Sequence, residues 1–273
     1  MGSLGPREGE AEGFWEIRSV ALYGDTLVVH DARRSRAVLL DLTGAVLAWQ
    51  PVPADPLALL PLTGRRLVVT GSRDPETRAR HTLEIIRPDG VRERVVDTQF
   101  ELPEPGTRPG YGTALARTDN GFWAALPTEY RIARYADSGA YQTSVVREVG
   151  WFPAHVYARM QPGTPPTPRF EDVREDAAGR LWTLVWIADP DWNDPANFRK
   201  ARVEGQMFVG RLEDYYDSVI EVLHAGTGRL IAQGRFDDLI TGFVGDGMVV
   251  SLTHDVSGRT VIRVVRVRVV ESS

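Results

Sequence analysis

The stretch Gly179-Arg-Leu-Trp-Thr-Leu184 joins a glycine turn to a short run of apolar and β-branched residues. Four more copies of this phrase occur along the 273-residue chain. They read Gly24-Asp-Thr-Leu-Val-Val29, Gly64-Arg-Arg-Leu-Val-Val69, Asn120-Gly-Phe-Trp-Ala-Ala125 and Asp246-Gly-Met-Val-Val-Ser251. A unit that recurs every 40 to 67 residues is too small to bury its own apolar face, so successive copies stack on one another. The phrase therefore predicts a repeat architecture.

Further short strands flank each copy of the phrase. In the second copy a strand at 58–62 precedes the glycine turn, and a third strand follows at 82–87. The connector Asp89-Gly90 then leads into a fourth strand at 91–97, because glycine tolerates the positive φ that tight hairpins need. Four antiparallel strands per unit form the blade of a β-propeller, so we predict an all-β propeller with five visible blades. A β-sandwich with a similar number of strands is the alternative.

The composition of the chain excludes several kinds of chemistry. The chain has no cysteine, which excludes disulfides, thiolate catalysis and zinc held by cysteine. Its formal net charge is −5, so it has no general attraction for a phosphate backbone, and we expect no nucleic-acid partner. No apolar run is long enough for a membrane span, and no signal segment is visible. We expect a single propeller domain over residues 1–273.

The longest departure from the repeat is an insertion at 187–216, in the fourth unit. Helices are predicted within it at 195–208 and 211–216, since Asp194 followed by proline is a good helix start. One hypothesis is a lid in which Asp189, Asp191 and Asp194 offer oxygen ligands to calcium. The alternative is that these aspartates form turns and cap a helix, and the chain has no EF-hand spacing.

Two of the five histidines occupy similar places in their units. His30 and His254 each follow a second strand and precede an aspartate. One hypothesis places them on loops that face one opening of the propeller, where they bind a ligand or form a His–Asp acid/base pair. The alternative is that the two histidines occupy similar places only because the units repeat, and that each following aspartate forms a turn. The chain has no His-Glu-x-x-His and no Gly-x-Ser-x-Gly, so we assign no catalytic residue.

The tryptophans fall into two groups. Trp151, Trp186 and Trp192 lie in predicted loops, which makes them candidates for ligand binding. Trp123 and Trp182 lie in second strands, where bulky residues fill the wedge between blades. We therefore predict a core-packing role for the second group.

Several motifs carry a family resemblance. They are Gly5-Pro-Arg-Glu-Gly-Glu-Ala-Glu-Gly-Phe14, Asn120-Gly-Phe-Trp123, Trp151-Phe-Pro153 and Thr227-Gly-Arg-Leu230. With these motifs, the chain resembles bacterial six-bladed β-propellers related to the NHL and TolB-like groups. In that family the Gly- and Glu-rich phrase lies between the first and second blades, so the resemblance implies that this chain lacks blade one. It also implies an exported or periplasmic protein if a longer N-terminus precedes Met1.

The sequence favours a binding function over catalysis. We expect a non-catalytic scaffold that needs no cofactor and binds a small molecule, a peptide or a protein at the propeller mouth, mainly through the 187–216 insertion. The alternative is a metal-dependent hydrolase of the gluconolactonase or regucalcin type, which would need calcium or another divalent cation. That family's metal ligands have no position-by-position match in this chain.

Overall fold

The computed structural model describes residues 14–52, 58–70, 83–95, 114–126, 129–154, 164–194, 211–245, 247–255, 257 and 259–270. The chain divides into two compact units. Unit 1 consists of Met1–Pro105, Tyr111–Phe122 and Tyr135–Gln142. Unit 2 consists of Gly106–Gly110, Trp123–Arg134 and Thr143–Ser273.

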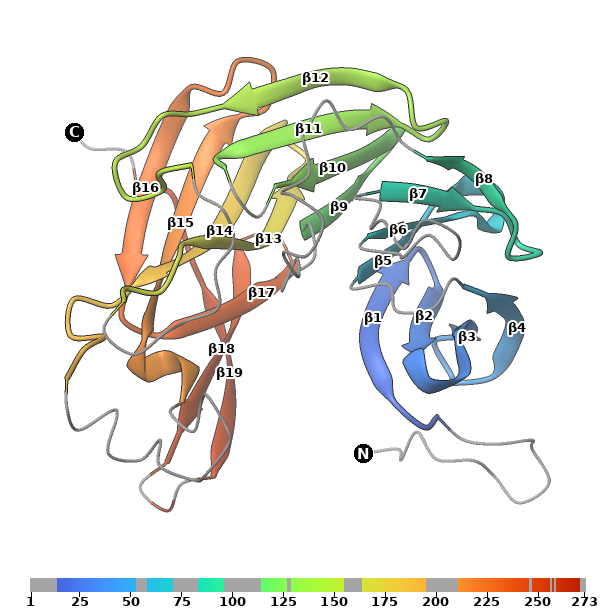
Figure 1. Ribbon diagram of the computed structural model, residues 1–273, viewed down its shortest axis with the longest axis horizontal. Coiled ribbons are helices and arrows are strands. Elements are labelled where there is room, and N and C mark those ends of the chain that lie inside the picture. The colour runs from blue at the N-terminus through green and yellow to red at the C-terminus, as the bar shows by residue number, and fades with distance from the viewer. Residues whose placement is uncertain are drawn as a thin grey trace. The chain divides into compact units, whose positions relative to one another are not determined.

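The strands form five sheets in chain order, here called blades 1 to 5 (Figure 1). Blade 1 contains β1 (Ile17–Tyr23), β2 (Thr26–Asp31), β3 (Arg36–Asp41) and β4 (Val46–Pro51). Blade 2 contains β5 (Ala58–Pro61), β6 (Leu67–Thr70), β7 (Leu83–Ile86) and β8 (Arg92–Val95). Blade 3 contains β9 (Ala114–Thr118), β10 (Gly121–Ala125), β11 (Arg131–Ala136) and β12 (Tyr141–Val146).

Blades 4 and 5 lie in unit 2. Blade 4 contains β13 (Arg169–Glu175), β14 (Arg180–Ala188), β15 (Tyr216–His224) and β16 (Leu230–Phe236). Blade 5 contains β17 (Leu239–Gly245), β18 (Met248–His254) and β19 (Thr260–Arg266). Each blade is built from neighbouring strands in sequence order, which is the connectivity of a β-propeller. The prediction of an all-β propeller is confirmed. The described residues form five sheets and do not show the sixth blade that the family resemblance implies.

The predicted helical insertion is not supported. Its first helix, at 195–208, lies outside the described residues. The second, predicted at 211–216, is a single 3-10 turn, η3 (Leu212–Asp214), and the described part of the chain contains no α-helix. The next residue but one, Tyr216, already pairs with Ala188 of β14. Pairing with a long buried strand outweighs local helix propensity here. No helix among the described residues is long and apolar enough to cross a membrane.

Glycine sets the turn between the first two strands of a blade. Gly179, between β13 and β14, has φ +69, a left-handed conformation that other residues rarely adopt. The turn brings β14 back along β13, and Glu175 then lies opposite Leu181. The quoted phrase therefore specifies a hairpin, as predicted.

The core lies in the seams where successive blades pack face to face. In unit 1 the seam between blades 1 and 2 is aliphatic, with Val28 and Leu39 packing against Leu59, Leu67 and Ile86. In unit 2 the seam between blades 4 and 5 contains Trp182, Leu184, Ile220, Val222, Ile240 and Val249, with Phe236 and Phe243 against them. Burial of these faces removes apolar surface from water, which is the main stabilising contribution.

A buried polar cluster joins elements of blades 3 and 4 within unit 2. The hydroxyl of Tyr130 donates to Glu221 Oε2 at 2.5 Å and lies 3.0 Å from Thr183 Oγ1. Arg147 forms an ion pair with the same carboxylate. Burial, reinforced by the charge of Glu221, raises the pKa of the Tyr130 phenol, so the hydroxyl stays protonated as a donor.

Candidate ligand-binding pocket

The second strands of the blades share one buried position at which the size of the side chain differs. It is the residue after Leu27, Leu67, Phe122 and Leu181, which are equivalent in blades 1 to 4. The residues at this position are Val28, Val68, Trp123 and Trp182, and all four are buried. The core-packing prediction for the two tryptophans is confirmed.

The tryptophan fills the seam between blades 4 and 5. Trp182 Nε1–H donates to Asp176 Oδ2 at 2.8 Å, which fixes the indole in one orientation. Its ring meets Phe243 edge-on, with 6.3 Å between the ring centroids. In blade 1 the same position is Val28, which has far less volume.

A cavity of about 380 Å³ opens in the seam beside Val28, within unit 1. Its apolar wall includes Val28, Leu39 and Ala48 of blade 1 and Pro61 and Leu67 of blade 2. This volume lies in the usual range of small-molecule sites, about 300–1,000 Å³. Strands of blades 1 and 2 form one part of its lining, and the turn between β5 and β6 forms the other.

The rim of this pocket is the turn between β5 and β6. The turn contains the 3-10 element η2 (Thr63–Arg65). Both Gly64, with φ +71, and Arg65, with φ +58, are left-handed. That conformation costs a non-glycine residue roughly 1–2 kcal/mol. The turn therefore holds Arg65 at the rim of the pocket at the expense of some backbone strain.

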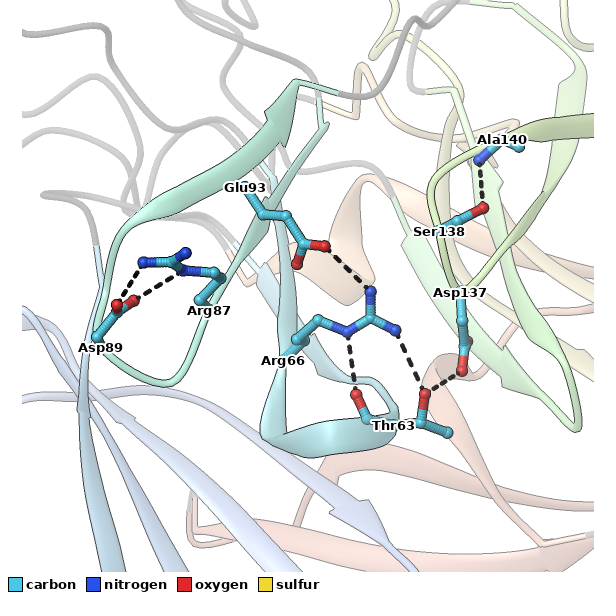
Figure 2. Close-up of polar contacts among 8 residues, drawn as sticks. All are labelled: Thr63, Arg66, Arg87, Asp89, Glu93, Asp137, Ser138 and Ala140. Atoms are coloured by element: carbon cyan, nitrogen blue, oxygen red, sulfur yellow. Dashed lines mark hydrogen bonds and ion pairs between the residues drawn. The ribbon is translucent and has the colours of Figure 1, made fainter.

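The second arginine of the rim is neutralised by its neighbours, as Figure 2 shows. Arg66 Nη1 donates to Glu93 Oε1 at 3.4 Å, and its Nε donates to the Thr63 carbonyl at 3.1 Å. The Thr63 hydroxyl donates in turn to Asp137 Oδ2 at 2.7 Å. Burial raises the pKa of Asp137, but hydrogen bonds from Arg117 and Thr63 outweigh this and hold the pKa below its ordinary value.

Arg65 differs from the other arginines on this side of blade 2. Arg66 pairs with Glu93, and Arg87 pairs with Asp89 through two hydrogen bonds (Figure 2). Arg65 is exposed and makes no hydrogen bond or ion pair with any residue that the structure describes. The pocket therefore combines an apolar wall with one uncompensated cation at its rim.

Three of the residues predicted as ligand-binding loop positions lie inside strands, and one of them is His254, the last residue of β18. His30 belongs to β2, is fully buried and pairs in register with Ala37. Trp186 belongs to β14, and its Nε1–H donates to the carbonyl of Ile240 at 2.6 Å. Both second strands extend further than their apolar runs suggested, because each pairs along its whole length with the third strand.

The described contacts of the two aspartates are with other groups. His254 Nδ1 lies 2.5 Å from Glu213 Oε1, while Asp255 Oδ1 accepts the Ser257 and Arg259 backbone N–H groups at 2.8 and 3.0 Å. Asp31 accepts the backbone N–H of Trp15 at 3.3 Å. Asp255 therefore organises a turn, whereas Asp31 binds backbone from a distant part of the chain and pairs with Arg36.

The two remaining tryptophans are half-buried. Trp151 meets Tyr130 edge-on, with 5.8 Å between ring centroids. Trp192 lies in the turn after β14, where its backbone N–H donates to the carbonyl of Asp189 at 3.1 Å. Neither lines the pocket described above. A ligand-binding role for either residue stays a prediction.

The three aspartates of the insertion act within a turn. Asp189 Oδ1 accepts the N–H of Asp191 at 2.5 Å, and the N–H of Asp194 donates to the Asp191 carbonyl at 2.9 Å. Within the described ranges, no three or more His, Cys, Asp or Glu side chains are grouped so that they could hold a metal ion. The calcium hypothesis gains no support from this geometry.

Strand β13 carries two titratable groups that the sequence did not single out. Burial raises the pKa of Glu171 to about 7, although Arg169 Nε lies 2.5 Å from its Oε1. Burial also raises the pKa of Asp172 to about 6, although its Oδ2 accepts the N–H of Phe243 at 2.7 Å. Both groups already have protein partners, so a structural role accounts for them.

Comparison with known proteins adds information on the fold. No family model matches the chain, and no curated protein matches its sequence. The chain is similar to a presumed exported protein from Bacteroides fragilis, with TM-score 0.53 and 10% identity, over 91% of this chain and 69% of that one. A member of the DUF4221 family from Bacteroides vulgatus gives TM-score 0.50 and 9% identity, over 89% and 76%. These likenesses show the fold alone.

A streptogramin B lyase also matches, with TM-score 0.45 and 11% identity, over 93% of this chain and 69% of the lyase. A likeness this low carries no argument about activity. The bacterial neighbours support the β-propeller, and they do not single out the NHL or TolB-like groups.

Proposed function

We propose that this protein is a non-catalytic β-propeller that binds a small ligand in the pocket between blades 1 and 2. The observation that carries the proposal is the pocket at the edge of this seam. Val28 stands where blade 4 has Trp182, and a cavity of about 380 Å³ lies beside it. An apolar cavity with a few polar groups at its rim is the usual form of a small-molecule site.

The surroundings of the pocket favour binding in a preformed site. Val28 and Leu67 are each 1% exposed and lie in paired strands, so a ligand orders little on arrival. Rigid walls reduce the entropic cost of binding.

A filling substitution tests the proposal. We expect Val28→Trp to place an indole in the cavity and to abolish the thermal stabilisation that a bound small molecule gives the wild-type protein. Leu42→Trp is the matched control, because Leu42 is 66% exposed and does not line the pocket. Unchanged ligand stabilisation in a folded Val28→Trp protein would contradict the proposal. Ala48→Leu is a second, smaller filling variant if the indole prevents folding.

We also propose that the protein is exported and that it belongs to a six-bladed family. Export is supported by the likeness to a presumed exported protein and by the family resemblance. Membership of a six-bladed family rests on the resemblance in the quoted motifs. No described contact favours the metal-dependent hydrolase over the binding scaffold.

A further inference from the structure

We infer that the ligand of the pocket between blades 1 and 2 is a small amphiphilic carboxylate, with its anionic group at Arg65 and its apolar part against Val28. The inference rests on the proposed function and deepens it by naming the chemical class of the ligand. We base it on the positive charge of Arg65 at the rim of the cavity and on the apolar wall that contains Val28.

The charged end of the pocket lies at its rim. Arg65 and Arg66 both line the cavity, but Arg66 is held by Glu93 and Thr63. Arg65 has no partner among the described residues. An arginine at the edge of an apolar cavity offers a planar, permanently charged donor that suits a carboxylate.

The neighbouring acids do not cancel this charge. Glu93 is paired with Arg66, and Asp137 is paired with Arg117, whose Nη2 donates to Oδ2 at 3.0 Å. Within this network the three arginines, including Arg65, outnumber the two acids, which leaves one positive charge. The chain as a whole has a formal charge of −5, so this local positive charge is opposite in sign to the net charge of the chain.

The inner wall of the pocket leaves no place for a second charge. Val28, Leu39 and Leu67 are 1%, 7% and 1% exposed and offer only apolar atoms. Burying an unpaired charge against such a wall would be costly, whereas an alkyl chain gains by leaving water. A ligand with one anionic head and one apolar tail satisfies both ends, and Thr26 at the rim offers a further hydroxyl donor.

Calorimetric titration of the full chain with hexanoate, 1-hexanol and hexylamine tests the inference. We expect wild-type protein to prefer hexanoate over hexanol, to bind hexylamine least, and to lose hexanoate affinity as salt rises. Arg65→Gln should weaken hexanoate about tenfold and leave hexanol unchanged. Arg65→Lys should restore part of the preference, because it keeps the charge.

The control variant is Arg211→Gln, which removes one exposed positive charge that does not line the pocket. It should leave hexanoate binding as in wild type. Equal binding of hexanoate and hexanol, or an Arg65→Gln protein with unchanged hexanoate affinity, would overturn the carboxylate inference alone. Absence of binding by all three probes would also overturn it. Probe binding that survives Val28→Trp would instead count against the pocket itself.

Discussion

The seam between blades 1 and 2 and the seam between blades 4 and 5 are built from the same strands of the repeat, yet they are filled differently. The first is lined by Val28, Leu39 and Leu67 and contains a cavity. The second contains Trp182 with Phe243 against it. The two seams therefore differ at one shared position of the second strand, which is Val28 in the first and Trp182 in the second.

The two seams also differ in their charged groups. On β13, beside the filled seam, Glu171 and Asp172 are carboxyls whose pKa burial raises. The open seam has at its rim Arg65, a cation with no partner among the residues that the structure describes. The two seams thus differ both in how they are packed and in their charged groups, and the experiments below test these two differences separately.

The largest effect is expected from opening the filled seam. Trp182→Val should lower the free energy of unfolding by about 3–5 kcal/mol, because it creates a cavity and removes the donor to Asp176. Urea denaturation measures the loss. Trp49→Val is the matched control: Trp49 is 44% exposed, and we expect a change below about 1 kcal/mol. Equal losses in the two variants would mean that the buried position of Trp182 has no special role in stability.

A smaller effect is expected from the pH dependence of the filled seam. The pKa of Glu171 is raised in the folded protein from 4.5 to about 7, so its contribution to stability is fully present below pH 4.5 and is lost as the pH rises toward 7. Glu171→Gln removes this titration. Relative to wild type, the variant should gain about 3 kcal/mol between pH 4.5 and 7, at about 1.4 kcal/mol per pH unit. A constant difference between the two proteins across this range would contradict the burial of this carboxyl.

The strands and the packed tryptophans could be predicted from sequence, because runs of apolar and β-branched residues after glycine turns are local signals. The lengths of β2 and β14 could not. His30 and Trp186 looked like loop residues, yet each lies in a strand that pairs fully with its neighbour. Partner strands far along the chain decide where such strands end, and no local pattern records them.

The pocket itself was missed for a related reason. Val28 reads as an ordinary strand residue until it is compared with Trp123 and Trp182 at the same position of the repeat. Because Val68 occupies the same position in blade 2, that comparison alone does not single out the pocket. The left-handed backbone at Arg65 carried no such signal, since arginine is not typical of that conformation.

Methyl-resolved NMR during a hexanoate titration tests the central claim most directly, because it reports where the ligand lies. The account predicts that resonances of Val28, Leu39 and Leu67 shift with ligand concentration, while those of Val222 and Val249 in the filled seam stay in place. Shifts confined to the filled seam, or none at the three pocket residues at a saturating concentration, would contradict it.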